Sequence, residues 1–162
     1  MDMMKIRVLF LGLFLVVLLT GESSCKKKIP DNPNIPNVNI NYTIDPNSTQ
    51  FIQLNTVGGW LYLDEIPGMY IPYPSRGIIV YRLDINLFKA YERQPPNDPF
   101  KCDGDVNHLT KLVVGDNYPF VKDTCTNIMY SLLDGSVFSG QGQYPLIEYN
   151  AFYDGGLLYI NN

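Results

Sequence analysis

Residues 77–92 decide the fold, and they read Gly-Ile-Ile-Val-Tyr-Arg-Leu-Asp-Ile-Asn-Leu-Phe-Lys-Ala-Tyr-Glu. The stretch holds two runs rich in aliphatic and aromatic residues, 77–83 and 87–92, with Asp84-Ile85-Asn86 between them. β-Branched and aromatic side chains favour strands because they pack well on a pleated, half-buried surface. We therefore predict two consecutive strands here.

Similar short runs occur on both sides of this stretch, separated by turn residues. The predicted strands are 60–63, 77–83, 87–92, 109–114, 119–122, 129–133, 147–152 and 157–160. Three Asp-Gly pairs predict turns, and residues 149–160 predict a closing hairpin. No window has a clear helical period of apolar residues. The predicted fold class is therefore all-β, an antiparallel sandwich or barrel in one domain.

The first 24 residues have the pattern of a signal peptide. Lys5 and Arg7 precede an apolar run at 8–19, which is too short to span a bilayer, and small residues then lead to Cys25. A cysteine in this setting resembles the lipobox of bacterial lipoproteins, which implies that Cys25 is a lipid anchor. Glu22 stands where that pattern usually has Leu, so ordinary secretion or an uncleaved anchor stay open as alternatives.

Residues 25–48 are predicted to hold the lipid anchor and an extended Pro/Asn-rich linker, with the β domain at 49–162. Lys26 follows the anchor, whereas lipoproteins kept at the inner membrane usually have Asp there. We therefore expect a cell-envelope location, lipid-anchored in the outer membrane and facing the periplasm. The run Lys26-Lys27-Lys28 fits contact with anionic headgroups, and equally a solvated charge run.

The charge of the main body excludes one class of partner. Residues 31–162 hold 7 Lys or Arg against 14 Asp or Glu. A phosphate-binding surface needs the opposite balance, so no nucleic acid partner is expected. The expected partners are the membrane, through the lipid anchor, and an envelope protein.

Four stretches in order resemble the Rieske-type 2Fe–2S ferredoxin domain over residues 51–162. They are Gly77–Arg82, Ala90–Arg93, Leu132–Gly140 and Tyr144–Leu146. The resemblance implies a Rieske-like antiparallel fold with two long loops that bind the cluster in family members. It places the four cluster ligands of this sequence at Pro95, Asn97, Asp123 and Thr126.

None of these four residues can serve as a Rieske ligand, because that cluster needs two thiolates and two imidazoles. Misalignment does not change this conclusion, since residues 51–162 hold only two cysteines and one histidine. We therefore predict vacant cluster positions, no metal and no cofactor. Some Rieske proteins also join their two loops by a disulfide, and Cys102 and Cys125 lie near those positions, so the resemblance implies a disulfide between them. Export into an oxidising compartment favours this pairing, although a free thiol stays open.

Other site interpretations are weaker. Residues 103–107 begin like a calcium loop, but His108 and Val114 replace the Gly and Glu that such a loop needs, so an acidic surface turn is preferred. His108 has no identifiable nucleophile or orienting partner, and no catalytic residues are predicted. Trp60 and the tyrosines at 62, 70, 73 and 81 are expected mostly in the core or strands, and the alternative for Tyr70–Pro74 is an exposed aromatic loop that binds a protein or glycan.

The function predicted from sequence is a lipoprotein with a Rieske-like domain that lacks the cluster. It is expected to act as a non-catalytic binding or accessory module rather than as an enzyme. The alternative is an electron-transfer protein of the Rieske family that retains an iron–sulfur cluster or other metal through a different ligand set. An enzyme or glycan-binding protein with its site on unassigned loops is a third possibility.

Overall fold

The computed structural model describes residues 32–105 and 108–162. The predicted signal peptide at 1–24 and the predicted anchor Cys25 lie outside the described residues, as does the first part of the linker. Within the described ranges, no helix is long and apolar enough to cross a membrane.

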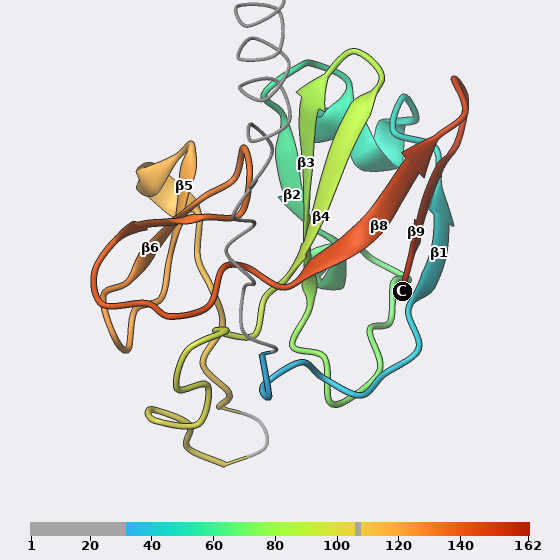
Figure 1. Ribbon diagram of the computed structural model, residues 1–162. Coiled ribbons are helices and arrows are strands. Elements are labelled where there is room, and N and C mark those ends of the chain that lie inside the picture. The colour runs from blue at the N-terminus through green and yellow to red at the C-terminus, as the bar shows by residue number, and fades with distance from the viewer. Residues whose placement is uncertain (1–31, 106–107) are drawn as a thin grey trace, which may run out of the picture. The chain divides into compact units, whose positions relative to one another are not determined.

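This part of the chain is all-β, with every strand pair antiparallel (Figure 1). A six-stranded sheet curls into a half-barrel in the order β1 (Asn41–Ile44), β9 (Leu158–Asn161), β8 (Glu148–Tyr153), β4 (Leu87–Glu92), β3 (Ile78–Asp84), β2 (Trp60–Tyr62). A smaller sheet has the order β5 (Phe120–Lys122), β6 (Met129–Ser131), β7 (Val137–Ser139). Three short 3-10 helices are η1 (Thr49–Leu54), η2 (Leu63–Glu65) and η3 (Gly115–Asn117). The prediction of an all-β antiparallel fold is confirmed.

Strand β3 is buried on both faces. Ile78 and Val80 belong to one hydrophobic core, whereas Ile79 and Tyr81 belong to the other. Side chains alternate along a strand, so each core receives every second residue. The first core lies against η1, β1 and β9, and the second contains residues of the smaller sheet such as Val121. An apolar run without polar alternation therefore places β3 between two cores.

Strand β4 repeats this arrangement beside β3. Phe88 and Ala90 enter the first core and Tyr91 enters the second. The β3–β4 register pairs Ile78 with Glu92 and shifts at a bulge between Arg82 and Asp84. Full burial of a large apolar side chain contributes about 1.5–3 kcal/mol, so this hairpin is a major source of stability.

The folded domain begins earlier than the sequence analysis predicts. Residues 40–48 were expected in the linker, but β1 pairs along its length with β9, and both Ile40 and Ile44 are buried. The signal was present as an alternation of apolar residues at Val38, Ile40, Tyr42 and Ile44. The asparagines between these residues are typical of a linker, and the strand with one buried face was therefore not predicted.

The strand expected at 109–114 is a second difference. These residues are all described, and only Val113 makes a bridge, with Lys122. The amide of Leu112 donates to the carbonyl of Arg93, and the amide of Val114 donates to the Tyr62 hydroxyl. The segment is extended and buries Leu112 and Val114, but its hydrogen bonds go to different partners rather than to one neighbouring strand.

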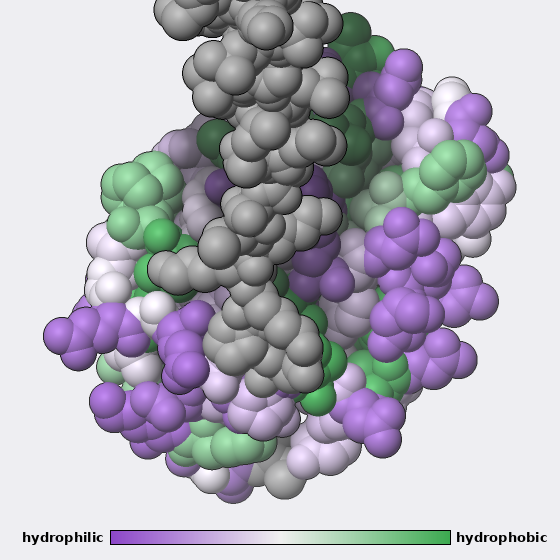
Figure 2. All heavy atoms as spheres, viewed as in Figure 1, coloured by the Kyte–Doolittle hydropathy of each residue, from purple (hydrophilic) through white to green (hydrophobic). Residues whose placement is uncertain are grey.

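The surface in view in Figure 2 is mostly polar, with hydrophobic side chains over the β3–β4 turn at the top. Ile85 and Leu87 are exposed in that turn. Scattered apolar residues of this kind are normal on protein surfaces and do not by themselves mark a site.

A buried carboxylate lies at the end of β4, where the chain leaves the large sheet. Glu92 is fully buried and accepts four hydrogen bonds, from Ser75 Oγ and Tyr149 Oη at 2.6 Å and from the amides of Arg76 and Gln94 at 2.8 and 2.9 Å. Burial, with the nearby Glu92 carboxylate as the next cause, raises the pKa of Tyr149 well above its usual value. This cluster fixes the direction of the chain after β4.

We predict that Glu92→Ala lowers the free energy of unfolding by about 3 kcal/mol or more, because it leaves buried donors without acceptors. The measurement is urea denaturation followed by circular dichroism. The matched control is Glu148→Ala on β8, where the lost partner is the partly exposed Lys89, and its expected cost is below about 1 kcal/mol. Equal costs for the two variants would contradict this account of Glu92.

Candidate functional site

Three irregular segments meet beside the smaller sheet and contain every position that the sequence analysis assigned to the vacant site. The first loop, residues 93–105, follows β4. The second loop, residues 123–128, joins β5 to β6, and the third segment, residues 140–146, leads from β7 towards β8. The contacts described below hold these segments together.

Asn97 connects the first loop to the other elements. Its Nδ2 donates to Tyr130 Oη and to the carbonyl of Tyr144, both at 2.9 Å. Its Oδ1 accepts from the amides of Gln143 at 2.8 Å and Tyr144 at 2.9 Å. These four bonds use the full capacity of a primary amide, and the residue is buried. Asn97 is therefore a saturated structural link between the first loop, β6 and the third segment.

Asp123 organises the second loop in a similar way. Its Oδ1 accepts from the amide of Cys125 at 2.9 Å, and its Oδ2 accepts from the Thr126 hydroxyl at 2.5 Å. Asp123 is completely buried, and Asn127 takes a positive φ of 60° as the chain turns back towards β6. Two of the four assigned ligand positions thus bond to each other.

The remaining assigned position, Pro95, is buried and has no side-chain donor or acceptor. In the third segment, a Cβ added at Gly142 would lie 2.9 Å from Val137 Cγ2 and 3.3 Å from Asn97 Nδ2. The close approach of Val137, with Ile128 at 3.2 Å and Asn97 beyond it, therefore leaves little room for a side chain at this position.

The disulfide implied by the resemblance is present. Cys102 and Cys125 are bonded, with Cα atoms 5.8 Å apart and a separation of 23 positions in sequence. The bond joins the first loop to the second, and closure of a loop of this length contributes about 3 kcal/mol by restricting the unfolded chain. Both cysteines of the domain are thereby used.

Tyr130 lies where these contacts converge. Burial raises its pKa to about 12, although the hydrogen bond from Asn97 opposes the shift and the Asp123 carboxylate adds to it. The hydroxyl therefore stays protonated at neutral pH. It can accept the bond from Asn97 and carries no charge into the second core.

The first loop is also held by Arg76, which the sequence analysis did not single out. Its guanidinium makes a two-bond ion pair with Asp103, at 2.9 and 2.7 Å, and donates to the carbonyls of Pro99 and Thr110. Burial tends to raise the pKa of Asp103, but hydrogen bonds from Thr110 and the charge of Arg76 outweigh it and keep that pKa below its usual range. Asp103 is thus an ion-pair partner rather than the start of a calcium loop.

A second arginine anchors the start of the first loop. Arg93 Nη1 contacts Asp64 at 2.8 Å and Glu65 at 2.9 Å, and its guanidinium carbon lies 3.6 Å from the centre of the Tyr62 ring. Lys111 also reaches Asp64 at 2.9 Å. These pairs connect the two ends of residues 93–111 to η2, so the long connection is fixed at both ends.

The residues in this region do not fit a Rieske cluster. The four assigned positions hold Pro, Asn, Asp and Thr, and their polar side chains are committed to the hydrogen bonds above. Cys102 and Cys125 are oxidised, and His108, the one histidine of the sequence, is exposed and contacts Asp105. Within residues 32–105 and 108–162, no group of three or more His, Cys, Asp or Glu is arranged to hold a metal ion.

The aromatic loop at 70–74 is exposed, as one of the sequence-based alternatives proposed. Tyr70 and Tyr73 are about three-quarters exposed, at 76% and 74%. By contrast, Tyr81 is buried, and Trp60 and Tyr62 are partly buried against the second core. The expectation of a core or strand position is therefore confirmed for Trp60, Tyr62 and Tyr81, and it is wrong for the two exposed tyrosines, which lie in a loop.

Comparison of the chain with protein-family models, curated proteins and solved structures found no significant match.

We predict that Asn97→Ala lowers the free energy of unfolding by about 2–4 kcal/mol, because four buried groups lose their partner. Urea denaturation measures the change. Asn117→Ala is the control, since Asn117 Nδ2 makes one partly buried bond to the Val114 carbonyl and its loss should cost about 1 kcal/mol or less. If Asn97→Ala is as stable as the control, Asn97 does not hold the segments together.

Proposed function

We propose that this protein is a cell-envelope lipoprotein whose β domain is Rieske-like, lacks the cluster and acts as a non-catalytic binding or accessory module. The single observation that carries the proposal is the set of four hydrogen bonds made by Asn97. In the resembled family, a ligand to iron would occupy this position and the cluster would organise the loops. In this chain the side-chain amide of Asn97 would organise the loops instead, through hydrogen bonds within the protein.

The arrangement of the chain supports the Rieske-like part of the proposal. The strands at 78–84 and 87–92 lead into the first loop, and the second loop precedes the Asp134-Gly135 turn. The third segment then returns to contact Asn97, and a disulfide joins the two loops. This is the order and the juxtaposition that the resemblance requires. We infer a binding role because Asn97 and the disulfide hold these loops as a fixed surface, which can bind a partner at lower entropic cost.

The envelope part of the proposal rests on the N-terminal sequence. A signal peptide ending before Cys25 would export the chain, and a lipid on Cys25 would hold it at the outer membrane, facing the periplasm. The disulfide is consistent with folding in an oxidising compartment. The expected partner is another envelope protein, for which this domain is an accessory subunit.

Metal analysis tests the absence of the cluster. We predict that the full chain, purified in detergent from membranes of an expressing bacterium, contains iron, zinc and copper far below one atom per chain and has no visible absorption band. The measurements are elemental mass spectrometry and a visible spectrum. A stoichiometric metal or an iron–sulfur absorption would instead support the electron-transfer alternative.

Lipidation is tested separately. We predict that an alkyne-tagged palmitate labels the wild-type chain, whereas Cys25→Ser abolishes the label and moves the chain from the membrane to the soluble fraction. The double substitution Cys102→Ser/Cys125→Ser is the control and should keep both the label and the membrane location. An unlabelled wild-type chain would show that it is secreted without lipid or kept by an uncleaved signal segment.

A further inference from the structure

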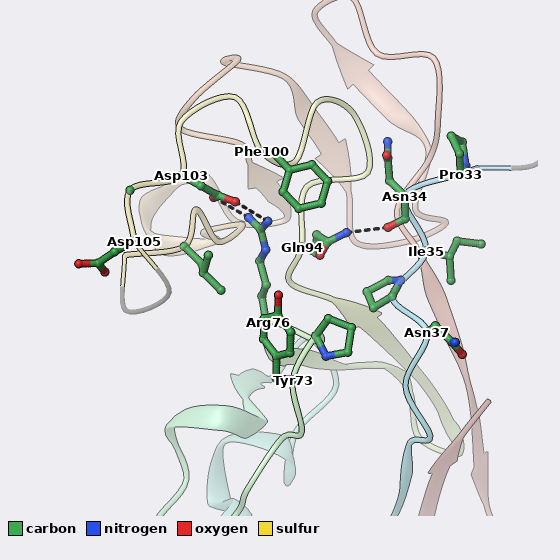
Figure 3. Close-up of a pocket in the computed structure, with 14 residues that line it drawn as sticks. Pro33, Asn34, Ile35, Asn37, Tyr73, Arg76, Gln94, Phe100, Asp103 and Asp105 are labelled. Carbon is green, nitrogen blue, oxygen red and sulfur yellow. Dashed lines mark hydrogen bonds and ion pairs between the residues drawn. The ribbon is translucent and has the colours of Figure 1, made fainter.

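A pocket of about 360 Å³ lies between residues 33–37, the segment at 73–76 and the first loop (Figure 3). Its lining includes Asn34, Tyr73, Pro74, Gln94, Phe100 and Leu109. A second hollow shares Asn34 and Phe100 with it and continues along Asp98 and Lys101. The volume is in the range of small-molecule sites, and the second hollow extends the surface available to a longer ligand.

Of the charged residues that line this pocket, Arg76 and Asp103 are paired with each other, and Asp105 contacts His108. The Arg76 and Asp103 side chains, 2% and 12% exposed, make the two-bond ion pair described above, and Figure 3 shows them bonded to each other. Arg76 Nη1 is further engaged by the carbonyls of Pro99 and Thr110. An anionic or cationic ligand would therefore have to compete with an existing buried pair, which favours a neutral ligand.

One buried polar side chain at the pocket, Gln94, has an acceptor atom that makes no hydrogen bond within the described residues. Gln94 is only 5% exposed; its amide N–H donates to Glu92, and its Nε2 donates to the Asn34 carbonyl at 2.6 Å. Its Oε1 has no hydrogen-bond partner among the described residues, and neither does Asn34 Oδ1. Both residues line the pocket, so two amide oxygens can accept bonds from a ligand.

Two aromatic rings border these acceptors. Tyr73 is 74% and Phe100 is 71% exposed, which is unusual for side chains of this size. Phe100 receives the Arg76 guanidinium 5.5 Å from its ring centre, which helps to fix its orientation. Exposed aromatic residues beside a hollow are typical of binding sites, because they offer a large apolar area at low entropic cost.

We propose that this pocket binds a neutral sugar unit of a glycan. A pyranose ring has an apolar C–H face that can pack on Tyr73 or Phe100, and hydroxyl groups that can donate to Gln94 and Asn34. An apolar peptide side chain would cover the Gln94 oxygen and leave it without a donor, which costs about 1–3 kcal/mol. This inference rests on the proposed function, because it names the ligand class of the binding module.

The test titrates the full chain in detergent with six neutral hexasaccharides, namely the cello-, xylo-, manno-, laminari-, malto- and chito-oligomers, and measures heat. We expect at least one to bind. Phe100→Ala and Tyr73→Ala should each raise its Kd by about tenfold or more, equivalent to 1.4 kcal/mol. Phe138→Ala removes a ring that is 58% exposed on β7 and not in the pocket lining, and it should leave the Kd unchanged.

Thermal melting of each variant shows whether it is folded. If the Phe100→Ala variant is unfolded, a second measurement is made on the unchanged chain. It looks for nuclear Overhauser contacts between sugar protons and the ring protons of tyrosine or phenylalanine. Binding by none of the six sugars, or binding that both ring variants retain, would overturn the proposal. Metal content of the same preparation tests the cluster separately, so the two claims can fail independently.

Discussion

The structure depends on one constraint, which is that β3 and β4 must bury both of their faces. Ile78 and Val80 face one core, and Ile79 and Tyr81 face the other, so the hairpin cannot sit at the surface of a two-layer sandwich. The large sheet must curl around one face, and the smaller sheet with its loops must cover the other. The insertion between β4 and β8 thus shields Tyr91, which is completely buried.

The long connections in this insertion need side chains that hydrogen-bond to their backbone, because irregular loops otherwise leave backbone N–H and C=O groups without partners. A few polar side chains fill this role, and each of them makes several hydrogen bonds. Asn97 and Asp123 bind backbone amides within and between the segments, and Arg76 gathers the carbonyls of Pro99 and Thr110. With the disulfide, they provide the fixed geometry that a metal cluster could otherwise supply. A surface fixed in this way can bind a partner at lower entropic cost.

The sequence allowed the fold class and most strands to be predicted, because runs such as 77–83 and 147–152 are strongly apolar. It also located the disulfide, through the resemblance. Strand β1 was missed, since its alternating apolar residues lie among asparagines and prolines that suggest a linker. Residues 109–114 were assigned to a strand because apolar content reveals burial but not hydrogen-bond partners.

The candidate site was predicted only in part. The residues at Asn97, Asp123 and Thr126 followed from the resemblance, but their mutual bonds did not. Apart from the neighbouring Gln94, the partners of Arg76 and Glu92 lie 16 to 57 residues away in sequence, among them Asp103 and Tyr149, and no local pattern encodes such distant pairs. The pocket could not be predicted from the sequence either, since the residues that line it come from separate segments near residues 34, 73 and 100.

The entry of the chain into the domain has a mechanical consequence. Upstream of β1, Asn34 is bonded to Gln94 and to the carbonyl of Pro96, and Asn162 then holds both Val38 and Ile40. A pull on the chain before Asn32 is therefore resisted first at Asn34, then at Asn162, and only afterwards by the pairing of β1 with β9. Because Asn34 forms a wall of the pocket, tension in the preceding chain would change the width of the pocket before it disturbed the sheet.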